Sequence, residues 1–467
     1  MYGGLKKSAS RLALVAAAGV LSTGAYAADL GGDCCADLEE RVAELEATTA
    51  RKGNRKVSLT ISGQVNRTIM YYNDGGRSNT YLGIDNSNTS TRFGFSGDAK
   101  ISPSVKAGFA ILIDIRDKAR STLVTQTTAE EGSSQERAGN HNGDHLMRMR
   151  AANWWIEHNQ FGRITMGRLN TSGPTGTIDL GGVGVVATAG EGCIGDSLFF
   201  RRTDGVLTTA SINTFSMACA NPGAREEGVQ WSSPTLAGFT VSASLTEATK
   251  VERLAESGVY SGSTGGGSTG RNWGADLRYA GEFSGVRAAA SLGYQRSEGN
   301  DDDSGFQNNS DFRIWGLAGS LLHVPTGLFI QAEYIAAKMT VADNTLAGSP
   351  LTAVTRDADR WHVQGGIRQN FFGIGATSLY GEYGKHNDFG VLNSVQTNGN
   401  SSFVTVGPIT TDSLRIWGVG MVQQIDAAAM DLYIGYRNYK ADAADAAGNA
   451  STLNSIDVIA AGARIRF

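Results

Sequence analysis

Few side chains in this sequence have the spacing that catalysis or metal binding requires. The six histidines show no ligand spacing with any of the four cysteines, so the pattern does not indicate a zinc site. A serine nucleophile needs a base within reach, and no Gly-x-Ser-x-Gly elbow occurs in the chain. We therefore predict no catalytic residues, no metal and no cofactor. The histidines are His141, His145, His158, His323, His362 and His386.

Cysteine chemistry remains possible. Cys193 and Cys219 both fall in a long segment, about 170 to 224, that is rich in glycine near its middle. In an oxidising compartment, a bond between them would close a separation of 26 residues and restrict the unfolded chain by about 3 kcal/mol. Cys34 and Cys35 are adjacent, so a bond within this pair would be strained and bonds between protomers are the better use. The alternative for this pair is two free thiols.

The two ends of the chain indicate the compartment. Lys6, Lys7 and Arg11 precede an apolar run over 12–21, and Ala25-Tyr-Ala27 provides a cleavage site, which predicts a signal peptide over 1–27. The last nine residues alternate apolar and polar side chains and end on Phe467. Such a strand resembles the C-terminal signal of bacterial outer-membrane barrels, which implies the barrel-insertion machinery as a partner.

Composition excludes several classes of protein. After the signal peptide there is no run of 18 apolar residues, so a helical membrane protein is excluded. Glycine accounts for 61 of 467 residues and proline for only 7, which favours many twisted strands joined by polar turns. Three of the 41 basic residues fall in 1–27, leaving 38 against 45 acidic ones in the mature chain. This balance gives no reason to expect nucleic-acid binding.

Period-two alternation begins directly after residue 56. Apolar side chains at Val57, Leu59, Ile61, Val65 and Ile69 share one face, and polar side chains share the other. One strand over 92–101 and another over 105–115 flank a turn at Ser102-Pro-Ser104, which predicts a hairpin. The same pattern of strand, short turn, strand and long polar loop recurs along the chain. Further short turns are expected near residues 159–162, 233–238, 281–285, 323–327, 370–375 and 426–429.

These segments predict an all-β fold, a transmembrane antiparallel barrel of 16 strands over 57–467. Two stretches, 197–200 and 206–215, could be further strands, which would give 18. A soluble β-sandwich would also alternate, but it would have shorter loops and no terminal Phe signal.

The segment 28–56 has a different pattern. Cys35, Leu38, Val42, Leu45 and Thr49 follow heptad spacing, which predicts a short periplasmic helix or coiled coil followed by a basic linker. Two heptads cannot associate alone, but an oligomeric barrel would bring several copies together. A single solvated helix is the alternative.

Three stretches resemble the Gram-negative general porins: Arg92-Phe-Gly-Phe-Ser-Gly-Asp98, the segment from Arg150 to Arg168, and the segment from Trp231 to Phe239. With the N-terminal coil, the arrangement is most similar to alphaproteobacterial porins. The resemblance implies an outer-membrane homotrimer of water-filled barrels through which small hydrophilic solutes and ions diffuse. It also implies contact with outer-membrane lipid and lipopolysaccharide, with peptidoglycan as a further partner.

In such porins the third loop folds into the lumen and places acids opposite arginines of the barrel wall. The resemblance implies that the loop at about 170–224 has this role, with Asp179, Glu191, Asp196 and Asp204 as the acids. Arg92, Arg148 and Arg150 would be the wall arginines, turned inward because Phe93, Phe95, Met149 and Ala151 take the lipid face. Arg225 matches a third wall position, but alternation with Val229 and Trp231 would turn it outward unless a bulge intervenes. Arg201 and Arg202 are the substitutes.

Facing rows of opposite charge across a narrow wet gap would create a transverse field that disfavours apolar solutes. The functional alternatives are a substrate-specific outer-membrane channel and a barrel that anchors the coil as an envelope tether. We predict that the protein is not an enzyme.

Overall fold

The computed structural model describes twelve stretches of the chain, which together contain the strands. They are residues 57–115, 120–122, 124–126, 147–176, 178–187, 194–216, 225–247, 270–299, 311–343, 352–391, 409–445 and 452–467. The predicted signal peptide and coil therefore lie outside the described residues. Within these stretches, no helix has the length and hydrophobicity needed to cross a bilayer.

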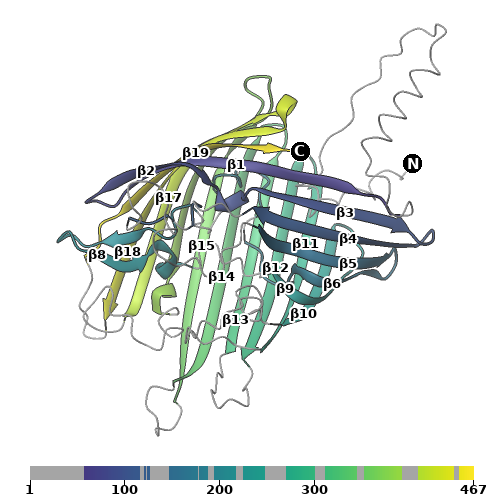
Figure 1. The fold of residues 1–467 in the computed structure, drawn as a ribbon, viewed down its shortest axis with the longest axis horizontal. Helices are drawn as coiled ribbons and strands as arrows, with labels where there is room; N and C mark the ends of the chain where they lie inside the picture. Colours follow the sequence, from purple (N-terminus) through teal and green to yellow (C-terminus); the bar gives the residue numbers. More distant parts are fainter. Residues whose placement is uncertain are drawn as a thin grey trace.

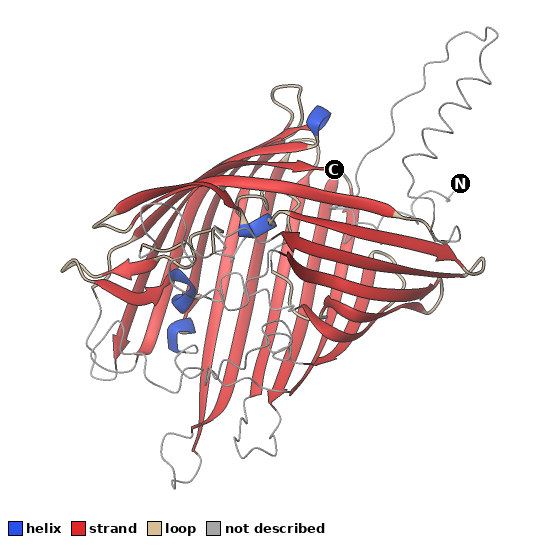
Figure 2. Ribbon diagram, in the orientation of Figure 1, coloured by secondary structure: helices blue, strands red, loops and turns tan. Residues whose placement is uncertain are grey.

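The structure is a closed antiparallel barrel of sixteen strand positions (Figures 1 and 2), which confirms the predicted fold class. Seventeen strands form one sheet, but β2 and β3 pair with successive parts of β1 and share one position in the ring. The ring strands are β1 (Thr60–Asn73), β2 (Ser78–Asp85), β3 (Arg92–Lys100), β4 (Val105–Ile115), β5 (Met147–His158), β6 (Gly162–Asn170), β9 (Arg225–Ser232), β10 (Phe239–Glu247), β11 (Gly270–Phe283), β12 (Val286–Gly299), β13 (Asp311–His323), β14 (Leu328–Asp343), β15 (Thr352–Gln369), β16 (Thr377–Asn387), β17 (Ile409–Ile425), β18 (Met430–Asp445) and β19 (Ile456–Arg466).

The last strand closes the ring against the first. β19 pairs with β1 from Gln64 opposite Arg466 to Asn73 opposite Asp457. At the end of this ladder, Phe467 and Gly63 exchange two backbone hydrogen bonds of 3.0 and 2.8 Å. The terminal residue therefore completes the pairing between the two ends of the sheet, in addition to any role as a sorting signal.

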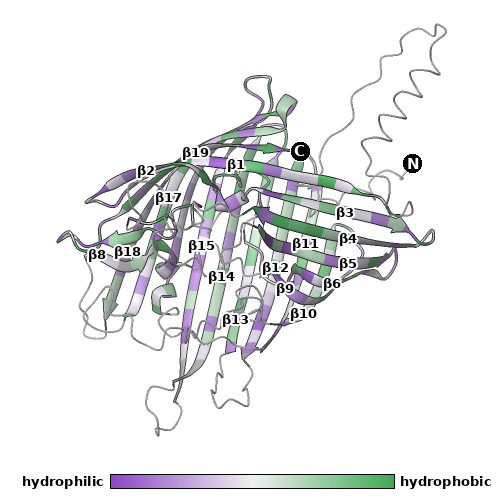
Figure 3. Cartoon of the chain, viewed as in Figure 1, coloured by the Kyte–Doolittle hydropathy of each residue, from purple (hydrophilic) through white to green (hydrophobic). Residues whose placement is uncertain are grey.

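The period-two alternation of the sequence places successive side chains on the lumenal and the outer face of the barrel. On β1, the Ile61 and Val65 side chains are 58% and 48% exposed on the outer face, whereas Asn66 and Thr68 are buried toward the lumen. The hydropathy colouring alternates in the same way along other strands (Figure 3). The predicted faces of the first strand are confirmed, and the outer face is the one that lipid can cover.

Aromatic side chains lie on the outer face at two levels. On β11–β18, each of four hairpins has a tryptophan–tyrosine pair well away from its short turn, with ring centroids 5.1 to 5.6 Å apart. Near the short turns, Phe283 and Phe372 are 82% and 68% exposed. Trp273 and Phe283 on β11 are ten residues apart, which on a tilted strand corresponds to about 25 Å, the height of a barrel's apolar band. The pairs are Trp273–Tyr294, Trp315–Tyr334, Trp361–Tyr383 and Trp417–Tyr436.

All seven predicted short turns join consecutive strands at one end of the barrel. The alternative prediction of a seventeenth and an eighteenth barrel strand is wrong. β7 (Phe199–Arg201) and β8 (Leu207–Ser211) form a separate two-stranded sheet, and residues Ile212–Phe215 form a 3-10 helix, η2. Conversely, β2 was not predicted as a separate strand; it begins directly after a tight turn at residues 74–77.

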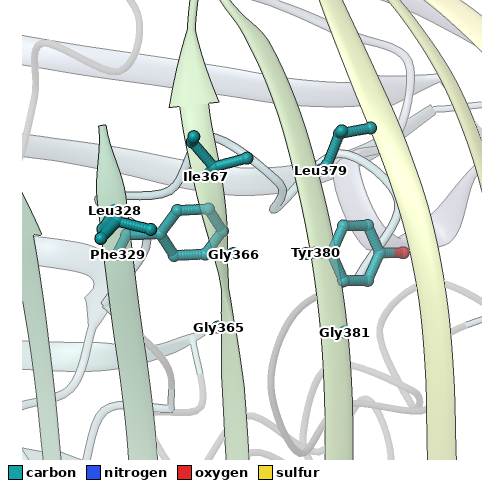
Figure 4. A pocket seen from close by; sticks show the side chains of 8 residues that line it. All are labelled: Leu328, Phe329, Gly365, Gly366, Ile367, Leu379, Tyr380 and Gly381. Carbon is teal, nitrogen blue, oxygen red and sulfur yellow. The ribbon is translucent and has the colours of Figure 1, made fainter. Parts of the chain in front are cut away.

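The outer surface has a hollow where glycines replace side chains. Residues of β14, β15 and β16 line this hollow, which has a volume of about 530 Å³ (Figure 4). Gly365 and Gly381 lie opposite each other in the ladder between β15 and β16, beside the exposed side chain of Leu379. A Cβ at Gly381 would have no neighbour closer than 3.9 Å, so this position tolerates a side chain.

The pairing of β19 with β1, here called the closing ladder, predicts the effect of a substitution at Gly63. A Cβ at this position would lie 2.8 Å from the backbone oxygen of Arg92 and 2.5 Å from the Phe467 ring. We therefore expect Gly63→Val to destabilise the barrel by about 1–3 kcal/mol. The measurement is the fraction of refolded protein that migrates as the compact form in unheated gel samples. Gly381→Val is the matched control and should fold like the parent, and equal folding of both variants would contradict the role of the closing ladder.

Candidate functional site

The segment between β6 and β9 enters the barrel. At its start, the backbone N–H of Ser172 donates to the Ser244 hydroxyl on β10 (2.8 Å). Further along, Arg368 on β15 donates to the carbonyl of Leu180 (3.2 Å), and the Ser378 hydroxyl on β16 donates to the carbonyl of Gly181 (2.6 Å). The described parts of residues 171–216, here called the inward loop, therefore lie against the lumenal face of the wall.

A six-residue insertion between β2 and β3 holds the middle of the inward loop. Residues 86–91 include the short 3-10 helix η1 (Ser87–Thr89). The Asn86 side-chain amide donates to the carbonyl of Val185 (3.0 Å) and to the Tyr433 hydroxyl on β18 (2.9 Å). The Asn88 amide donates to the carbonyl of Gly184 (2.6 Å). These two asparagines connect the loop to the wall beside the middle of β1, where the insertion separates β2 from β3.

Apolar packing fixes the loop to one side of the lumen. Its buried side chains join a core cluster with lumenal residues of β16–β19, β1 and β2, including Tyr380, Tyr433 and Val458. Burying each such aliphatic or aromatic side chain contributes about 1.5–3 kcal/mol. A hydrophobic core thus occupies this part of the lumen, and its buried members include no residue of β3–β6 or β9. The loop members are Val183, Val185, Val186, Ala187, Ile194, Leu198, Phe200, Ala210, Ile212 and Phe215.

The β7–β8 hairpin is held by a buried ion pair. Arg201 donates through Nε and Nη2 to the two carboxylate oxygens of Asp74 (3.0 and 2.9 Å), in the turn between β1 and β2. Burial alone would raise the pKa of Asp74, but the hydrogen bonds from Arg201 and from the backbone of Arg77 and Gly76 hold this pKa below its usual range. The hydrogen bond to Asp74 also raises the pKa of Arg201.

Two described acids of the inward loop contact groups within the loop itself. Asp179 accepts hydrogen bonds from the backbone N–H groups of residues 182, 183 and 184, and Asp204 pairs with Arg202 at 2.7 Å. Burial raises the pKa of Asp196 well above its usual range. Glu191, Cys193 and Cys219 lie outside the described residues.

The predicted wall arginines gather around one carboxylate, Asp114 on β4. The ladder places Asp114 opposite Arg92 on β3 and opposite Arg148 on β5. Arg150 forms an ion pair with the same carboxylate, and the Ser90 hydroxyl donates to it at 2.8 Å. Because Arg92 also lies opposite the buried Gln64, this face is the lumenal one. Sequence reasoning missed Asp114, although alternation with Ile113 would have placed it inward.

A bulge in β5 changes one predicted orientation. The register shifts between Leu112 and Ile113, which pair with Ala151 and Met149 respectively, so Arg150 is the extra residue. Met149 faces outward as predicted, but Ala151 shares the lumenal face with Leu112, contrary to the prediction. A bulge redirects a side chain in this way, and here it brings Arg150 to Asp114.

Arg225 lies near the wall arginines despite the alternation of its strand. It is within electrostatic range of Arg92, Arg148 and Arg150 as well as Asp114. Arg225 is the first residue of β9, where the ladder with β6 ends at Asn170, so its side chain need not follow the alternation. The proposed substitutes, Arg201 and Arg202, contact Asp74 and Asp204 instead.

Sequence reasoning also missed a row of buried charges along the lumenal face of β14–β18. Arg360 on β15 pairs with Glu333 on β14 at 3.1 Å, and Arg437 on β18 pairs with Glu382 on β16. The charged residues at alternate positions of β15 could have predicted these buried ion pairs. Among the described residues, no group of three histidine, cysteine or acidic side chains could hold a metal ion.

An outward apolar band, a closed ladder and an inward-folded loop define a channel-forming outer-membrane barrel. The chain belongs to the family of Gram-negative porins, whose family description matches residues 13–460. It is an outer-membrane channel for passive diffusion. No curated protein matches the sequence.

Several solved structures are similar to this chain at low sequence identity. The anion-selective porin from Comamonas acidovorans has a TM-score of 0.51 and 13% identity, covering 88% of this chain and 100% of that one. OmpF of Salmonella typhi, in complex with daunomycin, has a TM-score of 0.48 and 15% identity, covering 88% and 98%. The trimer form of OmpT from Vibrio cholerae has a TM-score of 0.48 and 14% identity, covering 88% and 99%.

The Asp74–Arg201 ion pair predicts how the hairpin is attached. Asp74→Asn leaves a buried guanidinium without its carboxylate, so we expect the attachment to weaken by about 3–5 kcal/mol. The measurement is hydrogen exchange of residues 199–211, which should quicken in the variant. Asp204→Asn is the control and should change little, because this carboxylate and its partner Arg202 are both 48% exposed.

The same pair predicts a dependence on pH. Because the folded pKa of Asp74 is depressed, its contribution is present above the ordinary carboxyl pKa and is lost as pH falls through the lower folded value. The difference in exchange between parent and Asp74→Asn should therefore persist at neutral pH and disappear only in strong acid. A constant difference at every pH would contradict this assignment.

Proposed function

We propose that the channel is a general diffusion pore whose narrowest part lies between the inward loop and the wall arginines Arg92, Arg148, Arg150 and Arg225. The observation that carries this proposal is the hydrophobic core between the loop and β16–β19, β1 and β2. Because this core fills one side of the lumen, solutes would pass on the side of Asp114 and its arginines. Small hydrophilic solutes fit a polar path of this kind.

Conductance measurements test this function. Purified protein in a planar bilayer should give discrete open steps whose conductance rises nearly in proportion to salt concentration, since a diffusion pore has no saturable site. A barrel that only anchors the N-terminal segment would give no steps. Conductance that saturates, or that one neutral sugar blocks at low concentration, would instead favour a substrate-specific channel.

We also propose that the protein assembles as a homotrimer through the outer face of β3–β6 and β9. These strands are short, and among their described residues no tryptophan–tyrosine pair marks a lipid boundary. Trp154, Ile156 and Met166 are nevertheless exposed there, which suits contact with another copy. We also propose that the outer face of the barrel contacts lipid and lipopolysaccharide. The barrel-insertion machinery would recognise the terminal strand that ends on Phe467.

The N-terminal segment 28–56, following a signal peptide over 1–27, is proposed as a periplasmic coil that could reach peptidoglycan. Cys34 or Cys35 would join protomers, and Cys193 and Cys219 would be bonded within the loop. These proposals rest on sequence pattern, because all four cysteines lie outside the described residues.

A deletion can test whether the barrel or the coil drives oligomerisation. Leu38, Val42 and Leu45 form too short an apolar stripe to associate alone, so barrel contacts should supply the oligomer. Deleting residues 33–52 should leave a heat-resistant oligomer on a semi-native gel, with unchanged conductance per channel. If the deletion yields monomers, the coil is the assembly element and the proposed barrel interface is wrong.

A further inference from the structure

A short segment after β16 turns into the lumen, at the end of the barrel opposite the short turns. Residues 388–391, here called the mouth strap, follow the last residue of β16, and 389–391 form one helical turn. The side chains of Phe389 and Val391 are buried, although the strap belongs to a connection between two strands. Connecting segments usually run over a protein's surface, so this burial indicates that the strap packs against the interior of the barrel.

Phe389 covers an apolar patch on the lumenal wall. It belongs to a buried cluster whose other members come from β13, β14 and β15. Those strand residues alternate with Trp315, Tyr334 and Trp361 of the outer face, so they face the lumen. Water would otherwise reach this patch, and burying a phenylalanine side chain contributes about 1.5–3 kcal/mol. The strand members are Ile314, Ile335, Ala337, Met339 and Ala358.

The other end of the strap contacts the inward loop. Val391 belongs to the apolar cluster that also contains Ile212 and Phe215 of η2. A Cβ at Gly390 would lie 2.9 Å from Cδ1 of Phe215, so the backbone of the strap lies against this ring. At this end of the barrel, apolar packing therefore extends from the inward loop to β13–β15. Less of the cross-section remains for water than the inward loop alone would leave.

Asp412 holds the strap in place. It shares the lumenal face of β17 with the buried Ile416. Its carboxylate accepts the backbone N–H of Val391 (2.7 Å) and that of Gly390. The Asp388 carboxylate accepts the backbone N–H of Asp412 (2.9 Å), and the carbonyl of Asp412 accepts the backbone N–H of Asp388 (2.9 Å). Asp388 has a φ of 60°, a conformation that a residue other than glycine keeps where surrounding contacts fix it.

We propose that the mouth strap is a second narrowing of the pore, in series with the narrowest part beside the inward loop, and that Asp412 positions it. The inference rests on the proposed diffusion function and adds a second determinant of the size limit. Resistances in series add, so displacing the strap should raise the conductance while the inward loop stays in place. Phe389, Gly390 and Val391 are uncharged, so the strap limits solutes by size and leaves the ion preference unchanged.

Two substitutions in the strap test this role without changing its charge. Gly390→Val displaces the strap, because a Cβ there would lie 2.8 Å from Oδ2 of Asp412 as well as against Phe215. Phe389→Ala removes the side chain that fills the lumen. Each should raise single-channel conductance by about 1.3-fold or more, and should raise the entry rate of raffinose relative to arabinose in proteoliposome swelling by about twofold. The reversal potential in a KCl gradient should stay at the parent's value.

Variants of Asp412 test whether this residue acts through the strap. Asp412→Ala leaves the N–H groups of Val391 and Gly390 without their acceptor, so it should raise the conductance as Gly390→Val does. Combining the two should add little to the larger single effect, because both release the same segment. Asp412→Asn keeps a side-chain oxygen that can accept from Val391, so it should restore most of the parent's conductance and swelling ratio.

Matched controls and a folding assay separate the outcomes. Asp442→Ala removes a 55% exposed aspartate of the neighbouring strand, and Phe372→Ala removes an exposed phenylalanine of the outer face, so neither should change conductance. Compact migration on an unheated gel shows that each variant has folded, and Phe389→Ala decides the question if Gly390→Val does not fold. Folded strap variants with the parent's conductance and swelling ratio overturn the second narrowing while leaving a channel. The absence of conductance steps in the parent overturns the diffusion function itself.

Discussion

The need to satisfy every backbone hydrogen bond within the membrane governs the architecture of this barrel. A strand in lipid cannot leave its N–H and C=O groups without partners, so a sheet that spans the membrane must close. Here β19 pairs with β1 over ten positions, and Phe467 and Gly63 complete the ladder. Closure creates a lumen, and the strand alternation then assigns every side chain to lipid or to the lumen. The aromatic pairs on the outer face follow the same division.

The lumen is not uniformly polar, and this is the main feature that the tertiary structure adds. Lumenal side chains of β16–β19, β1 and β2 include Tyr380, Ile416 and Val458, which are buried under the inward loop. The loop has a core of its own side chains, and polar anchors at Asn86, Ser378 and Arg201 hold its parts in place. The wall that carries Asp114 contributes no residue to this apolar core.

At the wall that carries Asp114, irregularities of the backbone position the charged side chains. Arg150 reaches Asp114 because a bulge adds one residue to β5, and Arg225 joins the group because it stands at the end of β9. Similar local irregularities recur elsewhere: the insertion at 86–91 interrupts a wall strand and supplies the asparagines that hold the loop. In each case a departure from regular pairing positions a side chain that regular pairing would have placed elsewhere.

Local period-two alternation and turn residues were sufficient to predict the barrel, its sixteen positions, the seven short turns and the outward face of β1. Alternation also predicted that Arg92 turns inward, and the ladder places it opposite Asp114. Three features could be seen only in the folded chain: residues 199–215 pack inside the barrel, Ala151 faces the lumen, and Arg225 lies near the other arginines. These outcomes depend on contacts between residues far apart in the chain, such as Asp74 with Arg201, and on single inserted residues that reverse the alternation. No local pattern contains that information.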